Sequence, residues 1–94
     1  MPVYVMLSSL TDEGAKTLTK HPNRISEVNK ELEAMGVKVL CQYATLGQFD
    51  FVTIAEAADN AIIAKASLEM ASRGTIRIQT LAAVTIDELV TNLG

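Results

Sequence analysis

Residues 22–56 read PNRISEVNKELEAMGVKVLCQYATLGQFDFVTIAE, and this stretch decides the fold class. Apolar side chains recur at steps of three and four over its first half, which predicts a helix with one apolar stripe. They are Ile25, Val28, Leu32 and Met35. Pro22 suits the first turn of this helix because it has no N–H to donate. Gly36 suits the left-handed residue that ends it.

Two strands follow the helix and are joined by a short turn. Residues 37–44 and 49–56 are rich in β-branched and aromatic residues, which favour extended structure. Leu46-Gly47-Gln48 supplies the turn between them, with Gly47 as the residue that takes a positive φ. The stretch therefore predicts a helix followed by a pair of antiparallel strands.

The flanking sequence extends this pattern on both sides. It predicts a strand over 2–10, a short turn of helix over 12–19, a helix from Asp59 or Asn60 through Arg73, and a strand over 75–84. Thr85-Ile86-Asp87-Glu88 is a capping box that opens a short last helix. The order of elements predicts an α+β fold of the ferredoxin-like split βαβ type, with one antiparallel four-stranded sheet and helices on one face. We expect residues 1–94 to form a single domain.

The composition limits the compartment and the partners. Eight Lys and Arg stand against 11 Asp and Glu, giving a net charge of −3, which argues against a nucleic-acid binder. No apolar run approaches the roughly 18–20 residues of a membrane span, and the first residues lack the basic region of a signal peptide. With Cys41 as the one cysteine and His21 as the one histidine, we expect no internal disulfide, metal or other cofactor. The expected location is the cytoplasm.

The helices of such a sheet cover one face, so the other face predicts the partner. We expect the more uniformly apolar set of side chains to face the helices. That set is Val3, Val5, Leu7, Val37, Val39, Cys41, Val52 and Ile54. The opposite set is Tyr4, Met6, Ser8, Leu40, Gln42, Phe49, Phe51 and Thr53, with either Arg77, Gln79 and Leu81 or Ile76, Ile78 and Thr80. It is too apolar for water, which predicts a homodimer packed through it; a single subunit with a partly solvated sheet is the alternative.

The space between the two sheets of that dimer is the first candidate site. On the prediction above it is lined by Tyr4, Gln42 and Phe51, and by Arg77 and Gln79 if those two share the same face. Ring faces, amides and one cation suit a small aromatic or carboxylate-bearing metabolite. The alternative is that these side chains satisfy one another across the dimer.

A second candidate site lies at one end of the sheet. Asp50, Tyr43 and Ser9 are predicted to point toward the helices there. Asp50 is expected to accept N–H bonds from the start of the first helix or to pair with Arg73. The alternative is a base or ligand anchor, formed by Asp50 with His21 or Tyr43. Cys41 is expected to be an inert, helix-facing residue.

Leu46-Gly47-Gln48-Phe49-Asp50-Phe51-Val52 resembles the GYD-domain family of small bacterial and archaeal proteins, and the likeness extends over the whole chain. The Gly-x-Tyr-Asp motif of that family falls on Gly47, Phe49 and Asp50, with Phe in the place of Tyr. The resemblance implies a ferredoxin-like fold of the dimeric α/β-barrel type. It implies no activity.

Three functions stay open on these observations. We favour a homodimer, or a larger homo-oligomer, that binds a small metabolite between its sheets. The alternatives are a small cofactor-independent enzyme, oxygenase- or isomerase-like, and a structural assembly subunit. Binding is favoured over catalysis because Trp is absent and His21 lies outside the predicted inter-sheet space.

Overall fold

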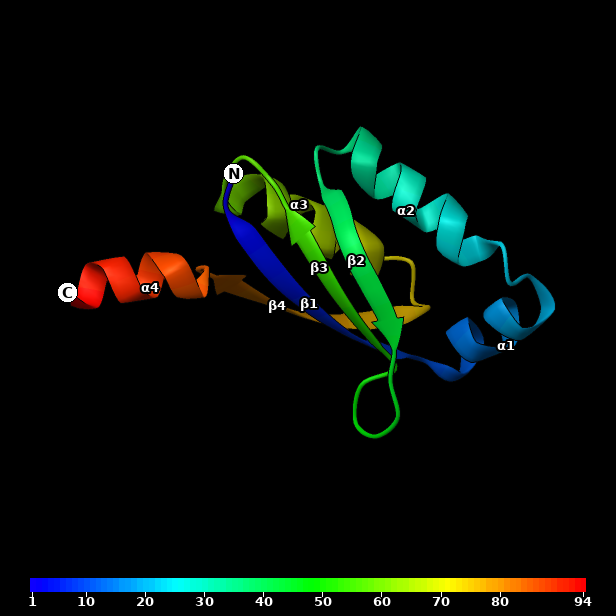
Figure 1. Ribbon diagram of the computed structural model, residues 1–94. Coiled ribbons are helices and arrows are strands. Elements are labelled where there is room, and N and C mark those ends of the chain that lie inside the picture. Colours follow the sequence, from blue (N-terminus) through cyan, green and yellow to red (C-terminus); the bar gives the residue numbers. More distant parts are fainter.

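In the computed structural model, which describes residues 1–94, four strands form one antiparallel sheet and three helices cover one of its faces (Figure 1). The elements are β1 (Val3–Leu10), α1 (Asp12–Lys20), α2 (Arg24–Ala34), β2 (Lys38–Ala44), β3 (Phe51–Glu56), α3 (Asn60–Ala71), β4 (Ile76–Ala83) and α4 (Ile86–Leu93). The strand order is β2-β3-β1-β4, which confirms the predicted ferredoxin-like α+β fold. The segment predicted as a short turn over 12–19 is a nine-residue α-helix.

Side-chain caps begin three of the helices. The hydroxyl of Thr11 accepts from the N–H of Gly14 at 3.1 Å, and the hydroxyl of Thr85 accepts from the N–H of Glu88 at 3.0 Å. Asp59 caps α3 in the same way. These bonds satisfy N–H groups that the first helical turn leaves without a partner. The helix starts predicted at Thr11, Asp59 and Thr85 are confirmed. Pro22 was predicted in the first turn of the second helix, but it lies before α2, which begins at Arg24 after Asn23.

The core lies between the sheet and the helices α2 and α3. Its apolar members are Tyr4, Met6, Leu32, Val37, Ala55, Ala57, Ile63, Ala66 and Met70. The helix α1 approaches the sheet at Gly14, where an added Cβ would lie 1.9 Å from the carbonyl oxygen of Thr75. Glycine at this position therefore sets how closely α1 packs against the start of β4.

The assignment of side chains to the two faces of the sheet was wrong for β1 and β3. We call the side under α1, α2 and α3 the covered face and the other side the free face. Tyr4, Met6 and Ser8 are buried on the covered face, as are Thr53 and Ala55. The predicted helix-facing set of β1 and β3 lies on the free face instead. It comprises Val3, Val5, Leu7, Val52 and Ile54.

A β-bulge makes the predicted face right for the first part of β2 and wrong for the rest. Val39 pairs with Ala55 on the covered face, as predicted, but the next paired residue is Cys41, opposite Ile54 on the free face. The extra residue, Leu40, shifts the alternation by one position. Cys41 is therefore exposed rather than buried behind helices. For β4 the sequence left two sets of residues open for the face without helices. The set on the free face is Arg77, Gln79 and Leu81, because these residues pair with free-face residues of β1.

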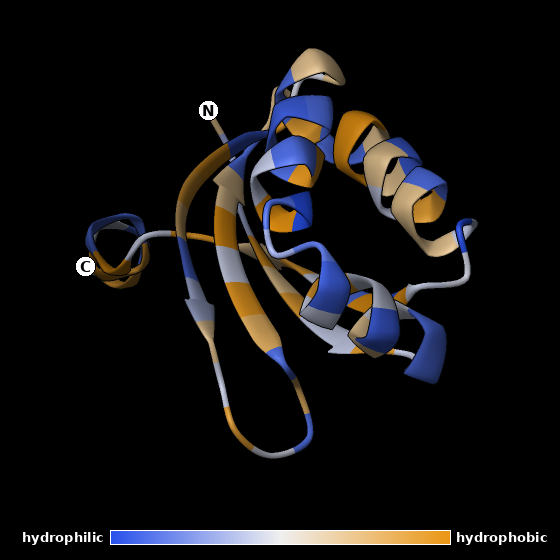
Figure 2. Ribbon diagram, turned by 90° about the vertical axis from the view of Figure 1, so that its right-hand side faces the viewer, coloured by the Kyte–Doolittle hydropathy of each residue, from blue (hydrophilic) through white to orange (hydrophobic).

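The helix α4 lies apart from the other three. Figure 2 shows α1, α2 and α3 on one side of the sheet and α4 on the other, beyond the end of β4. None of its residues is buried. Its exposed apolar side chains, together with one in the preceding link, are Val84, Ile86, Leu89, Val90 and Leu93. No helix of the chain is long and apolar enough to cross a membrane.

Candidate functional site

The free face presents two rows of side chains that run across all four strands. Strand register places Tyr43, Val52, Leu7 and Gln79 in one row, and Cys41, Ile54, Val5 and Leu81 in the next. Six of these eight side chains are aliphatic or aromatic. Tyr43 is 65% exposed and Leu81 is 41% exposed. A contiguous apolar surface of this kind is typical of an interaction site.

A cavity of about 170 Å³ lies on the opposite side, between the covered face and the helices. Its apolar wall comprises Met6, Leu10, Leu18, Ile25, Val28, Leu32, Phe51, Met70, Ile76 and Ile78. Its polar wall includes Ser8, Asn29, Gln42 and Thr53. Arg24 and Arg73 are the only charged side chains that line it. It therefore combines an apolar wall with a few polar groups, as small-molecule sites do.

Three polar side chains of the cavity form a chain of hydrogen bonds. The amide nitrogen of Asn29 donates to Gln42 Oε1 at 2.9 Å, and Gln42 Nε2 donates to the hydroxyl of Thr53 at 3.0 Å. This chain joins α2 to β2 and β3. It gives each of the two amides a partner on another element of the fold.

The hydroxyl of Ser8 is different. Ser8 is 6% exposed and lines the cavity, yet its side chain makes no hydrogen bond within the chain. Every side-chain nitrogen and oxygen that is fully buried has a hydrogen-bond partner, so the Ser8 hydroxyl is accessible from the open space of the cavity. A group bound in the cavity can therefore pair with it.

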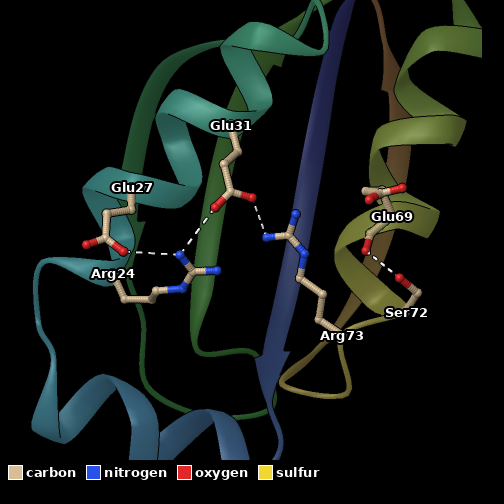
Figure 3. Close-up of polar contacts among 6 residues, drawn as sticks. All are labelled: Arg24, Glu27, Glu31, Glu69, Ser72 and Arg73. Atoms are coloured by element: carbon tan, nitrogen blue, oxygen red, sulfur yellow. Dashed lines mark hydrogen bonds and ion pairs between the residues drawn. The ribbon is translucent and has the colours of Figure 1, made fainter.

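An ion-pair network stands at the rim of the cavity (Figure 3). Glu31 of α2 bonds to Arg24 at 3.2 Å and to Arg73, which follows α3. Arg24 also bonds to Glu27 at 3.1 Å, which raises the pKa of its guanidinium. The hydrogen bond from Arg73 holds the pKa of the Glu31 carboxyl below its usual value. The network joins the ends of α2 and α3 across the rim.

The residues predicted to line an inter-sheet space are separated by the structure. Tyr4 is 1% exposed on the covered face, where its hydroxyl donates to Asn60 at 2.6 Å. Gln42 and Phe51 line the cavity under the helices. Only Arg77 and Gln79 lie on the free face. The prediction is wrong for Tyr4, Gln42 and Phe51 because the alternation in β1, β2 and β3 is opposite to the one assumed.

The Gly-x-Phe-Asp segment closes one end of the sheet. Asp50 Oδ2 accepts from the N–H of Leu10 at 2.8 Å, next to the residue that caps α1. Asp50 does not pair with Arg73, which bonds to Glu31 instead. Gly47 has a φ of 108°, and Phe49 is half-buried. Tyr43 points to the free face rather than toward the helices.

Sequence reasoning missed the rim and most of the polar wall of the cavity. Arg24, Glu27 and Glu31 recur at steps of three and four, so their shared helix face was readable from the sequence. Ser8 and Thr53 gave no such signal. Their role depends on which face of the sheet the helices cover.

Comparison with known proteins gives the family and one similar sequence. The family model described as "GYD domain" matches residues 4–92. A protein of Thermus thermophilus is 51% identical over 94 residues, covering 99% of each chain. It is named "Glutamine synthetase and cystathionine beta-lyase binding protein".

One solved structure supports the fold. A crystal structure of another Thermus thermophilus protein superposes with a TM-score of 0.57 at 17% identity, covering 90% of this chain and 95% of that one. A dimeric ferredoxin-like protein from an uncultured marine organism gives a TM-score of 0.47 at 10% identity, covering 92% and 95%. The first likeness shows a shared fold, and the second carries no further weight.

Proposed function

The chain belongs to the GYD-domain family, and from that premise we propose that it is a homodimer that acts by binding partner enzymes. The partners we propose are those in the name of its 51% identical relative, glutamine synthetase and cystathionine β-lyase. That identity extends over 99% of both chains, so the likeness is not confined to one part of the molecule.

One observation is the main support for the proposed dimer. The more aliphatic set of strand side chains lies on the face that the chain's own helices leave open. Leaving such a surface in water costs about 25 cal/mol for each Å² that a partner would otherwise bury. If the same face of a second copy packs against it, one interface with two-fold symmetry buries both surfaces.

The helix α4 supports the same arrangement. It lies on the free-face side of the sheet, beyond the end of β4 (Figure 2). Its apolar residues Ile86, Leu89 and Val90 are exposed in the single chain. A second sheet packed on the free face would lie beside α4, so each copy would flank the other with its last helix.

Light scattering after size exclusion tests the dimer. We expect twice the 10.1 kDa of one chain. Ile54→Glu, in the middle of the free face, should reduce the mass to that of one chain. Leu68→Glu is the matched control, because Leu68 is 73% exposed on α3. A wild-type monomer, or dissociation by the control alone, contradicts the proposal.

The partner enzymes are tested separately. Purified glutamine synthetase and cystathionine β-lyase are passed over the immobilised wild-type protein. We expect a saturable complex with at least one of them. No complex with either enzyme contradicts enzyme binding and leaves the dimer to be judged by its mass.

A further inference from the structure

The cavity under the helices differs from the rest of the interior in being open. Protein interiors are close-packed, and few voids exceed the size of a water molecule. An engineered apolar cavity of roughly 150 Å³ takes up one benzene molecule. A space of about 170 Å³ therefore has room for an apolar group of about six heavy atoms.

The lining is unsuited to water alone. Ten of the 19 lining residues are hydrophobic, so water molecules in this space would find few partners for the several hydrogen bonds that each needs. The occupant that fits the walls has an apolar body and at least one polar group.

The arginines at the rim select the polar group. The rim network pairs Arg24 and Arg73 with the carboxylates of Glu27 and Glu31, but of these four residues only the two arginines line the cavity. Each uses its Nη1 atom in the ion pairs with Glu31, and neither Nε nor Nη2 bonds to another residue. Guanidinium groups bind carboxylates through two adjacent N–H groups. The rim therefore has two open edges for an anion.

We propose that this cavity binds a small carboxylic acid with an apolar chain or ring of about six heavy atoms. The carboxylate bonds to the open edges of Arg24 and Arg73, and the apolar part lies among Met6, Val28 and Phe51. The site lies within one chain, so it stands apart from the proposed dimer and from its partner enzymes.

Calorimetric titration with matched probes tests the chemistry. The probes are 4-methylpentanoate and its uncharged counterpart 4-methylpentanamide, which has the same chain. We expect the acid to bind at least about tenfold more tightly than the amide, because only the acid carries the charge that the guanidinium groups stabilise. No detectable binding of the acid at millimolar concentration, or equal binding of both probes, overturns the proposal.

Two further acids identify the source of the ligand. Phenylacetate carries a ring in place of the branched chain, and L-leucine adds an ammonium group beside the carboxylate. Tighter binding of either one than of 4-methylpentanoate supports the proposal and assigns the ligand to aromatic acids or to amino acids.

Two arginine variants place the ligand. Arg73→Met removes one of the two cations that line the cavity, and Arg77→Met removes a cation from the free face. We expect the first to weaken binding of 4-methylpentanoate at least about tenfold and the second to leave it unchanged. Equal effects of the two variants overturn the assignment to the cavity.

Two other variants separate this site from steric and assembly effects. Val28→Phe, which fills the space, should abolish binding while the protein stays folded by circular dichroism. If Val28→Phe does not fold, the arginine pair decides alone. Ile54→Glu, on the free face, should bind the acid as the wild type does. Loss of binding in Ile54→Glu contradicts a site contained in one chain.

Discussion

The two faces of the sheet differ in how polar their side chains are, and the difference is informative only when the faces are compared. The covered face contains polar side chains such as Ser8, Gln42 and Thr53, although helices lie over it. The free face carries Val5, Val52 and Ile54, although no part of the chain lies over it. The apolar content of a strand therefore reflects every layer that covers it in the assembled protein, including layers that another chain supplies.

Polar groups are tolerated on the covered face because most of them have partners there. Thr80 shares a hydrogen bond of 2.8 Å with Ser67 of α3, and Gln42 bonds to both Asn29 and Thr53. Such bonds offset the cost of removing each group from water. Ser8 is the exception, and it lies where the cavity leaves room.

The largest expected effect comes from placing a charge on each face of the sheet in turn. Ala55 is 0% exposed on the covered face, and its neighbour Ile54 lies on the free face. A carboxylate in place of Ala55 has no partner and costs several kcal/mol, a large part of the stability of a small domain. We expect Ala55→Glu to give no cooperative thermal unfolding by circular dichroism. Ile54→Glu should still unfold cooperatively at a lower midpoint; an equal loss of structure in both variants contradicts the contrast.

The next effect concerns the close packing of α1 over the covered face. Gly14→Ala would place a Cβ 1.9 Å from a backbone oxygen, so α1 has to move away from β4. Overpacking of this kind costs about 1–3 kcal/mol. We expect a midpoint of urea unfolding clearly below that of the wild type. Ala15→Ser, at an exposed neighbour on the same helix, serves as the control; equal midpoints for both variants would show that α1 is not held closely.

A smaller effect is expected at the end of the sheet. Asp50→Asn keeps an oxygen that can accept from the N–H of Leu10, but it removes the charge that strengthens this bond. We expect a loss of about 1 kcal/mol and a decrease of several degrees in the melting midpoint, with the oligomeric mass unchanged. An unchanged or raised midpoint would favour a binding role for Asp50 over a structural one.

The last prediction concerns the rate at which Cys41 reacts. Cys41 is exposed on the free face of the single chain, and the proposed dimer covers it. We expect a thiol reagent to label the wild type slowly and the Ile54→Glu variant quickly, because access limits the reaction. Rapid stoichiometric labelling of a wild type that is dimeric by light scattering would show that the free face is not the interface.

The candidate site was less predictable than the fold, for a reason visible in β2. The alternation of Val37 and Val39 predicted their side correctly, but the bulge at Leu40 reversed the side of Gln42 and Tyr43. One extra residue in a strand exchanges its two faces, and nothing local in the sequence marks this one. The sequence therefore could not predict the chain of hydrogen bonds that joins Asn29, Gln42 and Thr53.

The sequence by itself determined the order of the elements and several of their ends. Apolar periodicity places α2 and α3, Thr11 and Thr85 cap their helices, and Gly36 ends α2 with a φ of 90°. These features depend on hydrogen bonds and steric limits within a few residues, so the local sequence specifies them.

Only the tertiary structure decided which face the helices cover, and with it the positions of Tyr4, Cys41 and Gln42. Both sets of strand side chains are apolar enough to be buried, so their pattern alone does not distinguish the two faces. The choice depends on how α2 and α3 pack over β1 and β3, with Tyr4 bonded to Asn60. Contacts between residues 56 positions apart settle it, because close packing selects among arrangements that local propensity leaves equivalent.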